Sequence, residues 1–340
     1  MRGNRSVLSA ALALASAVAL VTGCSSHDDD TAAPSAGAPG AAAVAPVPAA
    51  APTAGVTAFG PIATLLAEPG SGRVITLDPT GLALHIVDPA DPGAARAITL
   101  QSRATGLALG ASGEVLVPAG REVLRVEVAT TAVHSLPVDA TVRAVARRGD
   151  GSVVVGLDGG RVRILDAQGR PSRTIGDLGT VDAIATTASS IATLDLDQTS
   201  LTELDLGRDR AGLALRAGLG ATHVIGDHFG RLLATDTSGG ALLVYTTDPL
   251  LLRQRFPVGA APYALAYDER SDTVWLTLTG SNEVVGFDLS TGIPAEVGRF
   301  ATVRQPDSLT IDSRTGDMFV GSATGDGLQR ISADQRKRGQ

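Results

Sequence analysis

The 340-residue chain has very few aromatic residues and almost no cysteine or lysine. Its single cysteine, Cys24, excludes a disulfide framework and any paired-cysteine redox or zinc site. Only 3% of the residues are aromatic, whereas 44% are hydrophobic and 40 are glycine. This composition favours many short strands joined by tight turns over a helical protein.

The chain also lacks a basic surface. Its formal net charge is −7, and it falls to about −9 if Arg2 and Arg5 leave with an N-terminal leader. Binding to phosphates requires a clustered basic face, so we expect no nucleic-acid partner. Arg336, Lys337 and Arg338 stand at the end of the chain, and we predict that residues 335–340 form a disordered, solvated tail.

The signatures of common enzymes are missing. The sequence contains no Gly-x-Ser-x-Gly elbow, Walker loop, His-Glu-x-x-His or Gly-x-Gly-x-x-Gly motif. The five histidines, at positions 27, 85, 134, 223 and 228, do not have the spacing of a metal site, and we interpret them as structural. We therefore expect no catalytic residue, no metal and no cofactor apart from a covalent lipid.

That lipid is predicted by the N-terminus, which has the pattern of a bacterial lipoprotein signal. A basic start, an apolar run over residues 7–21 and a small-residue end describe a secretory signal peptide at residues 1–23. The run is short for a membrane span of about 20 residues. Val21-Thr22-Gly23-Cys24 fits a lipobox, which predicts cleavage between Gly23 and Cys24 and attachment of diacylglycerol and an acyl group such as palmitate to Cys24. We expect a chain anchored on the extracytoplasmic face of the cell membrane.

Residues 24–55 follow the signal and are rich in alanine and proline. The segment has no aromatic residue and cannot form a core, so we predict a disordered, partly extended tether. The run of aspartates at 28–30 is interpreted as a solvated charge cluster and not as a metal site.

Beyond residue 55 the sequence repeats with a period near 40 residues. One phrase consists of a small residue or proline, a variable residue and an apolar strand, and it starts at residues 104, 142, 181, 222, 262 and 306, with a less regular copy near 63. A second phrase is an alternating strand with an Asp-like end, and its copies end at residues 88, 127, 166, 205, 246, 288 and 332. Four short strands in each unit predict an all-β, seven-bladed β-propeller over residues 56–334.

Two features of the repeats have structural interpretations. The last unit has only three strands, so residues 56–60 are expected to supply its outer strand and close the ring, which hides exposed strand edges. The repeated aspartates are expected to accept hydrogen bonds from turn amides after each strand.

Several stretches resemble known propellers. GSNEVVGFDLSTG at 280–292 is similar to YVTN/YncE-like and NHL-like β-propellers. The stretch 213–312, the phrase VARRGDGSVVVG in the third unit and the layout of leader, lipobox and tether resemble the LppL-type lipoproteins of mycobacteria and related actinobacteria. The resemblance covers nearly the whole mature chain. It implies an envelope-anchored, secreted propeller and brings no assigned reaction.

One set of residues is a candidate ligand site. The second residue of each first phrase is polar or can form hydrogen bonds, and in a propeller these positions would surround one mouth of the central channel. They are Thr105, Arg143, Asp182, His223, Tyr263 and Asp307. Such a ring can bind a small polar ligand or a peptide end, although polar strand ends are also expected in any propeller. If it is a site, replacing Arg143 and Asp182 together with alanine should abolish binding and leave the fold intact.

Two functions follow from these patterns. The first is a non-catalytic binding or scaffolding propeller, monomeric and in contact with the membrane through its lipid, whose partner is an envelope protein or a small polar ligand. The second is a propeller hydrolase or lactonase with a metal at the channel mouth, for which Asp182, Asp307, Asp227 and Asp268 are the candidate ligands. Propellers support both roles, so the fold does not choose between them.

Overall fold

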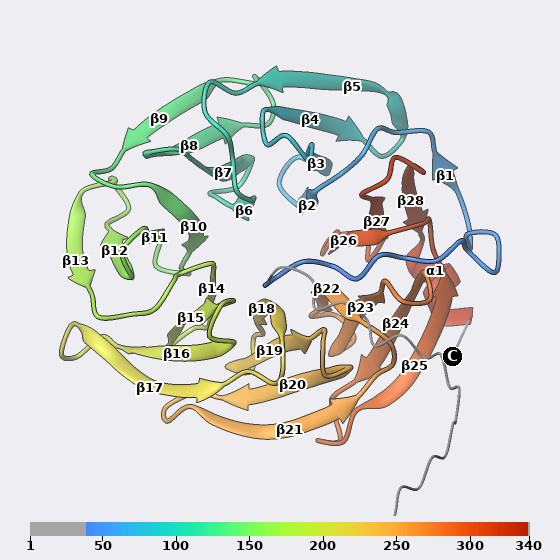
Figure 1. The fold of residues 1–340 in the computed structure, drawn as a ribbon. Helices are drawn as coiled ribbons and strands as arrows, with labels where there is room; N and C mark the ends of the chain where they lie inside the picture. The colour runs from blue at the N-terminus through green and yellow to red at the C-terminus, as the bar shows by residue number, and fades with distance from the viewer. Residues whose placement is uncertain (1–38, 339–340) are drawn as a thin grey trace, which may run out of the picture. The chain divides into compact units, whose positions relative to one another are not determined.

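The computed structural model describes residues 39–338 and shows seven four-stranded antiparallel sheets arranged as the blades of a ring (Figure 1). In each blade the first strand lies nearest the centre and the last lies at the rim. The prediction of an all-β, seven-bladed propeller is confirmed.

The first four blades follow one another along the chain. Blade 1 contains β2 (Thr64–Glu68), β3 (Arg73–Leu77), β4 (Ala83–Asp88) and β5 (Asp91–Thr99); blade 2 contains β6 (Ala108–Leu109), β7 (Glu114–Ala119), β8 (Glu122–Glu127) and β9 (Val133–Pro137); blade 3 contains β10 (Val142–Arg147), β11 (Val153–Leu157), β12 (Arg161–Leu165) and β13 (Pro171–Ile175); blade 4 contains β14 (Ala183–Thr186), β15 (Ile191–Asp195), β16 (Ser200–Asp205) and β17 (Arg210–Arg216).

The last three blades complete the ring, and the seventh uses both ends of the propeller sequence. Blade 5 contains β18 (Ala221–Gly226), β19 (Arg231–Asp236), β20 (Ala241–Thr246) and β21 (Leu251–Pro257); blade 6 contains β22 (Pro262–Asp268), β23 (Thr273–Leu278), β24 (Glu283–Asp288) and β25 (Ala295–Ala301); blade 7 contains β26 (Pro306–Ile311), β27 (Met318–Ser322), β28 (Leu328–Ile331) and β1 (Val56–Thr57). A short helix, α1 (Ala333–Arg338), follows β28.

The ring closes where β1 pairs antiparallel with β28, so that Val56 lies opposite Gln329 and Thr57 opposite Leu328. Next to this pair, the Arg330 N–H donates to the Gly55 carbonyl at 2.9 Å. The expected closure by residues at the start of the propeller is therefore confirmed. It covers the edge of β28, which would otherwise present unpaired main-chain groups to other chains.

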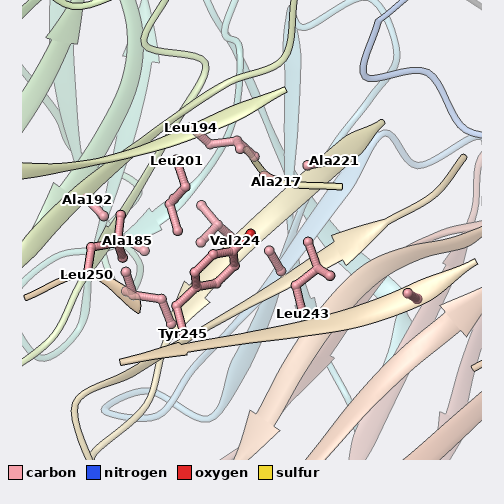
Figure 2. Close-up of a cluster of buried hydrophobic side chains, with 13 residues drawn as sticks. Ala185, Ala192, Leu194, Leu201, Ala217, Ala221, Val224, Leu243, Tyr245 and Leu250 are labelled. Carbon is pink, nitrogen blue, oxygen red and sulfur yellow. The ribbon is translucent and has the colours of Figure 1, made fainter. Parts of the chain in front are cut away.

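The hydrophobic core is divided into seven clusters, and each cluster fills the interface between two adjacent blades. The cluster between blades 4 and 5 shows the pattern, with Leu194 and Leu201 facing Leu243 and the fully buried Tyr245 (Figure 2). Because aliphatic side chains fill almost all of these interfaces, the chain forms a large core with very few aromatic rings.

The repeated aspartates do serve turns, as the sequence predicted. Asp88, Asp166, Asp205 and Asp288 each accept a hydrogen bond from a main-chain N–H two to four residues further on. At Asp288 the donor is Ser290 N–H at 2.7 Å, and this bond holds the pKa of the carboxyl below its ordinary value. These side chains are therefore already used by the fold.

Two predicted disordered segments require correction. Residues 39–55, which we call the strap, lie against the propeller and bury Ala45, although the whole range 24–55 was predicted to be a disordered tether. The predicted tail 335–340 begins inside α1, where Arg336 is buried. In both places, hydrogen bonds to distant parts of the ring supply the stabilisation that these polar or small-residue segments cannot generate locally. Earlier parts of the tether lie outside the described residues.

Candidate functional site

Three of the six predicted ring residues lie at β-bulges of the inner strands, and a fourth, His223, directly follows one. The register between the first two strands of a blade shifts at Arg143, at Tyr263 and at Asp307. In blade 5 it shifts at Thr222, and His223 pairs with Thr235. A bulge inserts an extra residue and redirects a side chain, which is why these positions can face the channel mouth while their neighbours remain in the core.

The structure brings five of the six ring residues together around one cavity of about 350 Å³. Each comes from a different blade, from the second to the sixth: Thr105, Arg143, Asp182, His223 and Tyr263. Asp307, in blade 7, does not line this cavity. Burial raises the pKa of Tyr263 to about 12, and the nearby charge of Asp307 adds to this effect. Asp307 accepts a hydrogen bond from Gln305 Nε2, which also contacts the strap.

Arg143 is the centre of an ionic network at the mouth. Its guanidinium donates to Asp182 through Nε, at 3.1 Å, and through Nη2, and to Asp158 through Nη1 at 3.2 Å. Hydrogen bonding to Asp182 raises the pKa of Arg143. The single positive charge of Arg143 is therefore matched by two carboxylates, so it does not offer a free cation to an anionic ligand.

Asp182 is held in place from several sides. Its Oδ2 accepts from the Thr180 hydroxyl at 2.5 Å and from the Leu196 N–H at 3.0 Å. Burial acts to raise the pKa of Asp182, but these hydrogen bonds and Arg143 together lower it below the ordinary value. The carboxylate is therefore charged at neutral pH and has a fixed orientation.

The other side of the cavity is formed by two rings. His223 and Tyr263 pack edge to face, with ring centroids 4.6 Å apart. Burial lowers the pKa of His223 to about 4, and a hydrogen bond with the Tyr263 main chain offsets only part of this effect. The imidazole is thus neutral at physiological pH. Its Nδ1 is buried and has no hydrogen-bond partner among the described residues.

The start of the strap reaches the same mouth (Figure 1). The Tyr263 hydroxyl donates to the Gly40 carbonyl at 3.0 Å. A Cβ atom at Gly40 would lie 2.5 Å from Cδ1 of Leu196 in blade 4, so a residue with a side chain would not fit without movement. Sequence reasoning missed this contact, because nothing local in an Ala/Pro-rich segment indicates where it packs.

The carboxylates considered for a metal site do not converge. Asp227 binds Arg231 and two turn N–H groups, and Asp268 is paired with Arg336. Both stand at or after the far ends of inner strands, whereas Asp182 stands at the start of one. Within residues 39–338, no group of three His, Cys, Asp or Glu side chains has a geometry that could hold a metal ion.

The predicted lipidation site, Cys24, and the predicted cleavage position at Gly23 lie outside the described residues. Over residues 39–338 the structure contains no helix of the length and hydropathy needed to cross a membrane.

Comparison with known proteins identifies the fold by structure and not by sequence. No family model matches the chain, and no curated protein sequence does. Among solved structures, hydrazine synthase of Kuenenia stuttgartiensis is similar with a TM-score of 0.69 and 11% identity, covering 83% of this chain and 98% of that one. The Cps50 (Swd1) β-propeller domain of Myceliophteria thermophila has a TM-score of 0.67 and 12% identity, covering 82% and 98%. Streptogramin B lyase has a TM-score of 0.64 and 11% identity, covering 81% and 94%. At this identity the likenesses show a shared β-propeller fold.

Proposed function

We propose that this chain is a non-catalytic binding propeller of the LppL type, held on the extracytoplasmic face of the cell membrane by a lipid on Cys24. Its binding site is the cavity at the channel mouth. The observation that carries the proposal is the convergence of five polar or aromatic side chains, one from each of five successive blades, on a single cavity of about 350 Å³.

The charges around the cavity favour a ligand with an amino group. Arg143 is offset by Asp158 and Asp182, and His223 is neutral, so no uncompensated positive side chain lines the cavity. The adjacent Asp307 adds negative charge above its raised pKa of about 6. A peptide amino terminus or another small amine meets these carboxylates and the electron-rich face of Tyr263.

The absence of converging carboxylates supports binding over metal-assisted hydrolysis. The acids proposed for a metal site form no three-membered cluster within residues 39–338. Asp182, Asp227 and Asp268 pair with arginines, and Asp307 accepts from the side chain of Gln305. The positions that do converge carry one hydroxyl, one paired guanidinium, one paired carboxylate and two rings.

The test is calorimetric titration of the full mature chain with tri-alanine and with N-acetyl-tri-alanine. We expect tri-alanine to bind and the acetylated peptide to bind at least tenfold more weakly. The variant Asp182→Asn should lose at least tenfold in affinity for tri-alanine. The matched control Asp150→Asn changes an exposed turn aspartate outside the cavity and should have no effect.

Two results would contradict the proposal. Equal binding of both peptides, or binding that is insensitive to Asp182→Asn, would show that the cavity is not the site or that the amine is not recognised. Hydrolysis of tri-alanine during incubation, followed by NMR, would contradict the non-catalytic assignment.

A further inference from the structure

We propose that the strap occupies a peptide-binding surface, and that this surface accepts an extended, uncharged, alanine- and proline-rich peptide from another molecule when the strap lifts. The surface belongs to blades 6 and 7. Its binding groups, which we call the amide seat, are the side chains of Asn282, Gln305 and Gln329. This inference is independent of the ligand proposed for the channel cavity.

The amide seat recognises main-chain groups. Gln305 accepts the Ala45 N–H through Oε1 at 2.8 Å and donates from Nε2 to the Ala43 carbonyl at 2.9 Å, a two-point contact with residues two positions apart. Asn282 Nδ2 donates to the Pro46 carbonyl at 3.0 Å. Gln329 Nε2 donates to the Thr53 carbonyl at 2.5 Å. None of these contacts depends on the side chains of the strap.

The seat is rigid and buried. Asn282, Gln305 and Gln329 are 2%, 9% and 0% exposed. Asn282 Oδ1 accepts the Gln305 N–H at 2.9 Å, and Asp307 accepts from Gln305 Nε2 at 2.8 Å, which fixes the orientation of the Gln305 amide. Gln329 also has partners within the ring, the Val303 N–H and the Ala301 carbonyl. Buried amide groups need hydrogen-bond partners, so Gln305 Oε1 and Asn282 Nδ2 are the atoms arranged to receive a peptide backbone.

The strap itself shows which peptides fit. Ala45 is 2% exposed, whereas its neighbour Val44 is 88% exposed and Val47 is 79% exposed. One small side chain therefore enters the surface, and the outward-facing positions accept any side chain. Pro46 and Pro48 restrict the backbone to extended conformations, which reduces the entropy lost when such a segment binds.

The occupant in trans is therefore a peptide with the chemistry of the strap. A tethered strap competes at a high effective concentration, so an external peptide binds measurably only when the strap is displaced. The structure offers a matched pair of substitutions for this purpose, because adjacent residues of the strap are buried and exposed. Ala45→Arg places a large charged side chain where there is no room, whereas Val44→Arg points the same side chain into solvent.

The experiment uses the full mature chain and a fluorescein-labelled synthetic peptide with the sequence of residues 39–53, followed by fluorescence anisotropy. We expect the Ala45→Arg chain to bind the peptide at least tenfold more tightly than the Val44→Arg chain or the unmodified chain. Adding Gln305→Ala to Ala45→Arg should abolish binding. Adding Asp182→Asn should leave it unchanged, which separates this surface from the channel cavity.

Two outcomes would overturn the inference. One is a folded Ala45→Arg chain that does not bind the peptide, and the other is peptide binding that survives Gln305→Ala. If Ala45→Arg does not fold, amide hydrogen exchange on the unmodified chain tests whether the strap lifts. The Ala45 N–H should exchange faster than the N–H groups that pair β27 with β28, because the strap lifts without unfolding of the ring, and equal rates would refute the proposal.

Discussion

Replacing Arg336 with alanine should destabilise the propeller far more than its position near the end of the chain suggests. Arg336 lies in α1, and its Nη2 donates to Asp268 Oδ2 at 2.8 Å and to the Gly316 carbonyl. Asp268 ends β22 of blade 6, and Gly316 precedes β27 of blade 7. The guanidinium carbon also lies 5.2 Å from the centre of the Trp275 ring. One side chain therefore connects the helix to two blades.

The magnitude follows from burial. The Arg336 and Asp268 side chains are each only 6% exposed, so removing the guanidinium leaves a buried carboxylate without its cation. Breaking a buried ion pair in this way costs about 3–5 kcal/mol of unfolding free energy. With an m-value of about 3 kcal/mol per molar urea, the unfolding midpoint should fall by about 1–1.7 M.

The assay is urea unfolding followed by the fluorescence of Trp275, the only tryptophan, which contacts Arg336. The control is Lys337→Ala, the next residue of the same helix, which is exposed and should change stability by about 0.5 kcal/mol or less. In an Asp268→Asn background, Arg336→Ala should lower the free energy of unfolding by clearly less, because no carboxylate is left unpaired. Equal midpoints for Arg336→Ala and Lys337→Ala would refute the reasoning.

Three further predictions concern other parts of the chain. Cys24→Ala should move the protein from the membrane fraction to the soluble fraction with an unchanged circular dichroism spectrum, and retention in the membrane would contradict the lipid anchor. Burial raises the pKa of Asp307 from 3.8 to about 6, so the unfolded chain loses this proton first and the contribution of Asp307 to stability falls as the pH rises from 4 to 6. Asp307→Asn should remove this pH-dependent part of the stability, measured as the difference between the urea midpoints at pH 4.5 and pH 7. A difference equal to that of the unmodified chain would contradict the raised pKa of Asp307. Tyr245→Phe should lower the free energy of unfolding by about 1 kcal/mol, because the buried hydroxyl donates to the Arg216 carbonyl at 3.0 Å. Urea unfolding measures this change.

The sequence was informative wherever a feature repeats. A unit of about 40 residues with four strands predicts one blade, and seven such units predict seven blades. The last unit has only three strands, so its fourth strand had to come from the start of the propeller. The aspartates after the strands recur at a fixed offset, and the sequence predicted their places at turns. The polar residues near the start of the inner strands recur in the same way, and five of the six line one cavity. These features depend on local backbone geometry, which short sequence patterns encode.

Only the tertiary structure decided the contacts that do not repeat. Arg143 pairs with Asp158 and Asp182, whereas Asp307 lies outside the cavity and accepts a hydrogen bond from Gln305. The partners of each ring residue depend on the residues around it in the folded ring.

The two ends of the described chain show most clearly what the sequence alone does not predict. Ala45 meets Gln305 across 260 positions of sequence, and Arg336 meets Asp268 across 68. Composition marked both ends as disordered because neither can form a core alone. Closure of the ring brings both ends onto blades 6 and 7, where buried amides and a buried carboxylate already need partners, and this long-range arrangement leaves no local sequence signal.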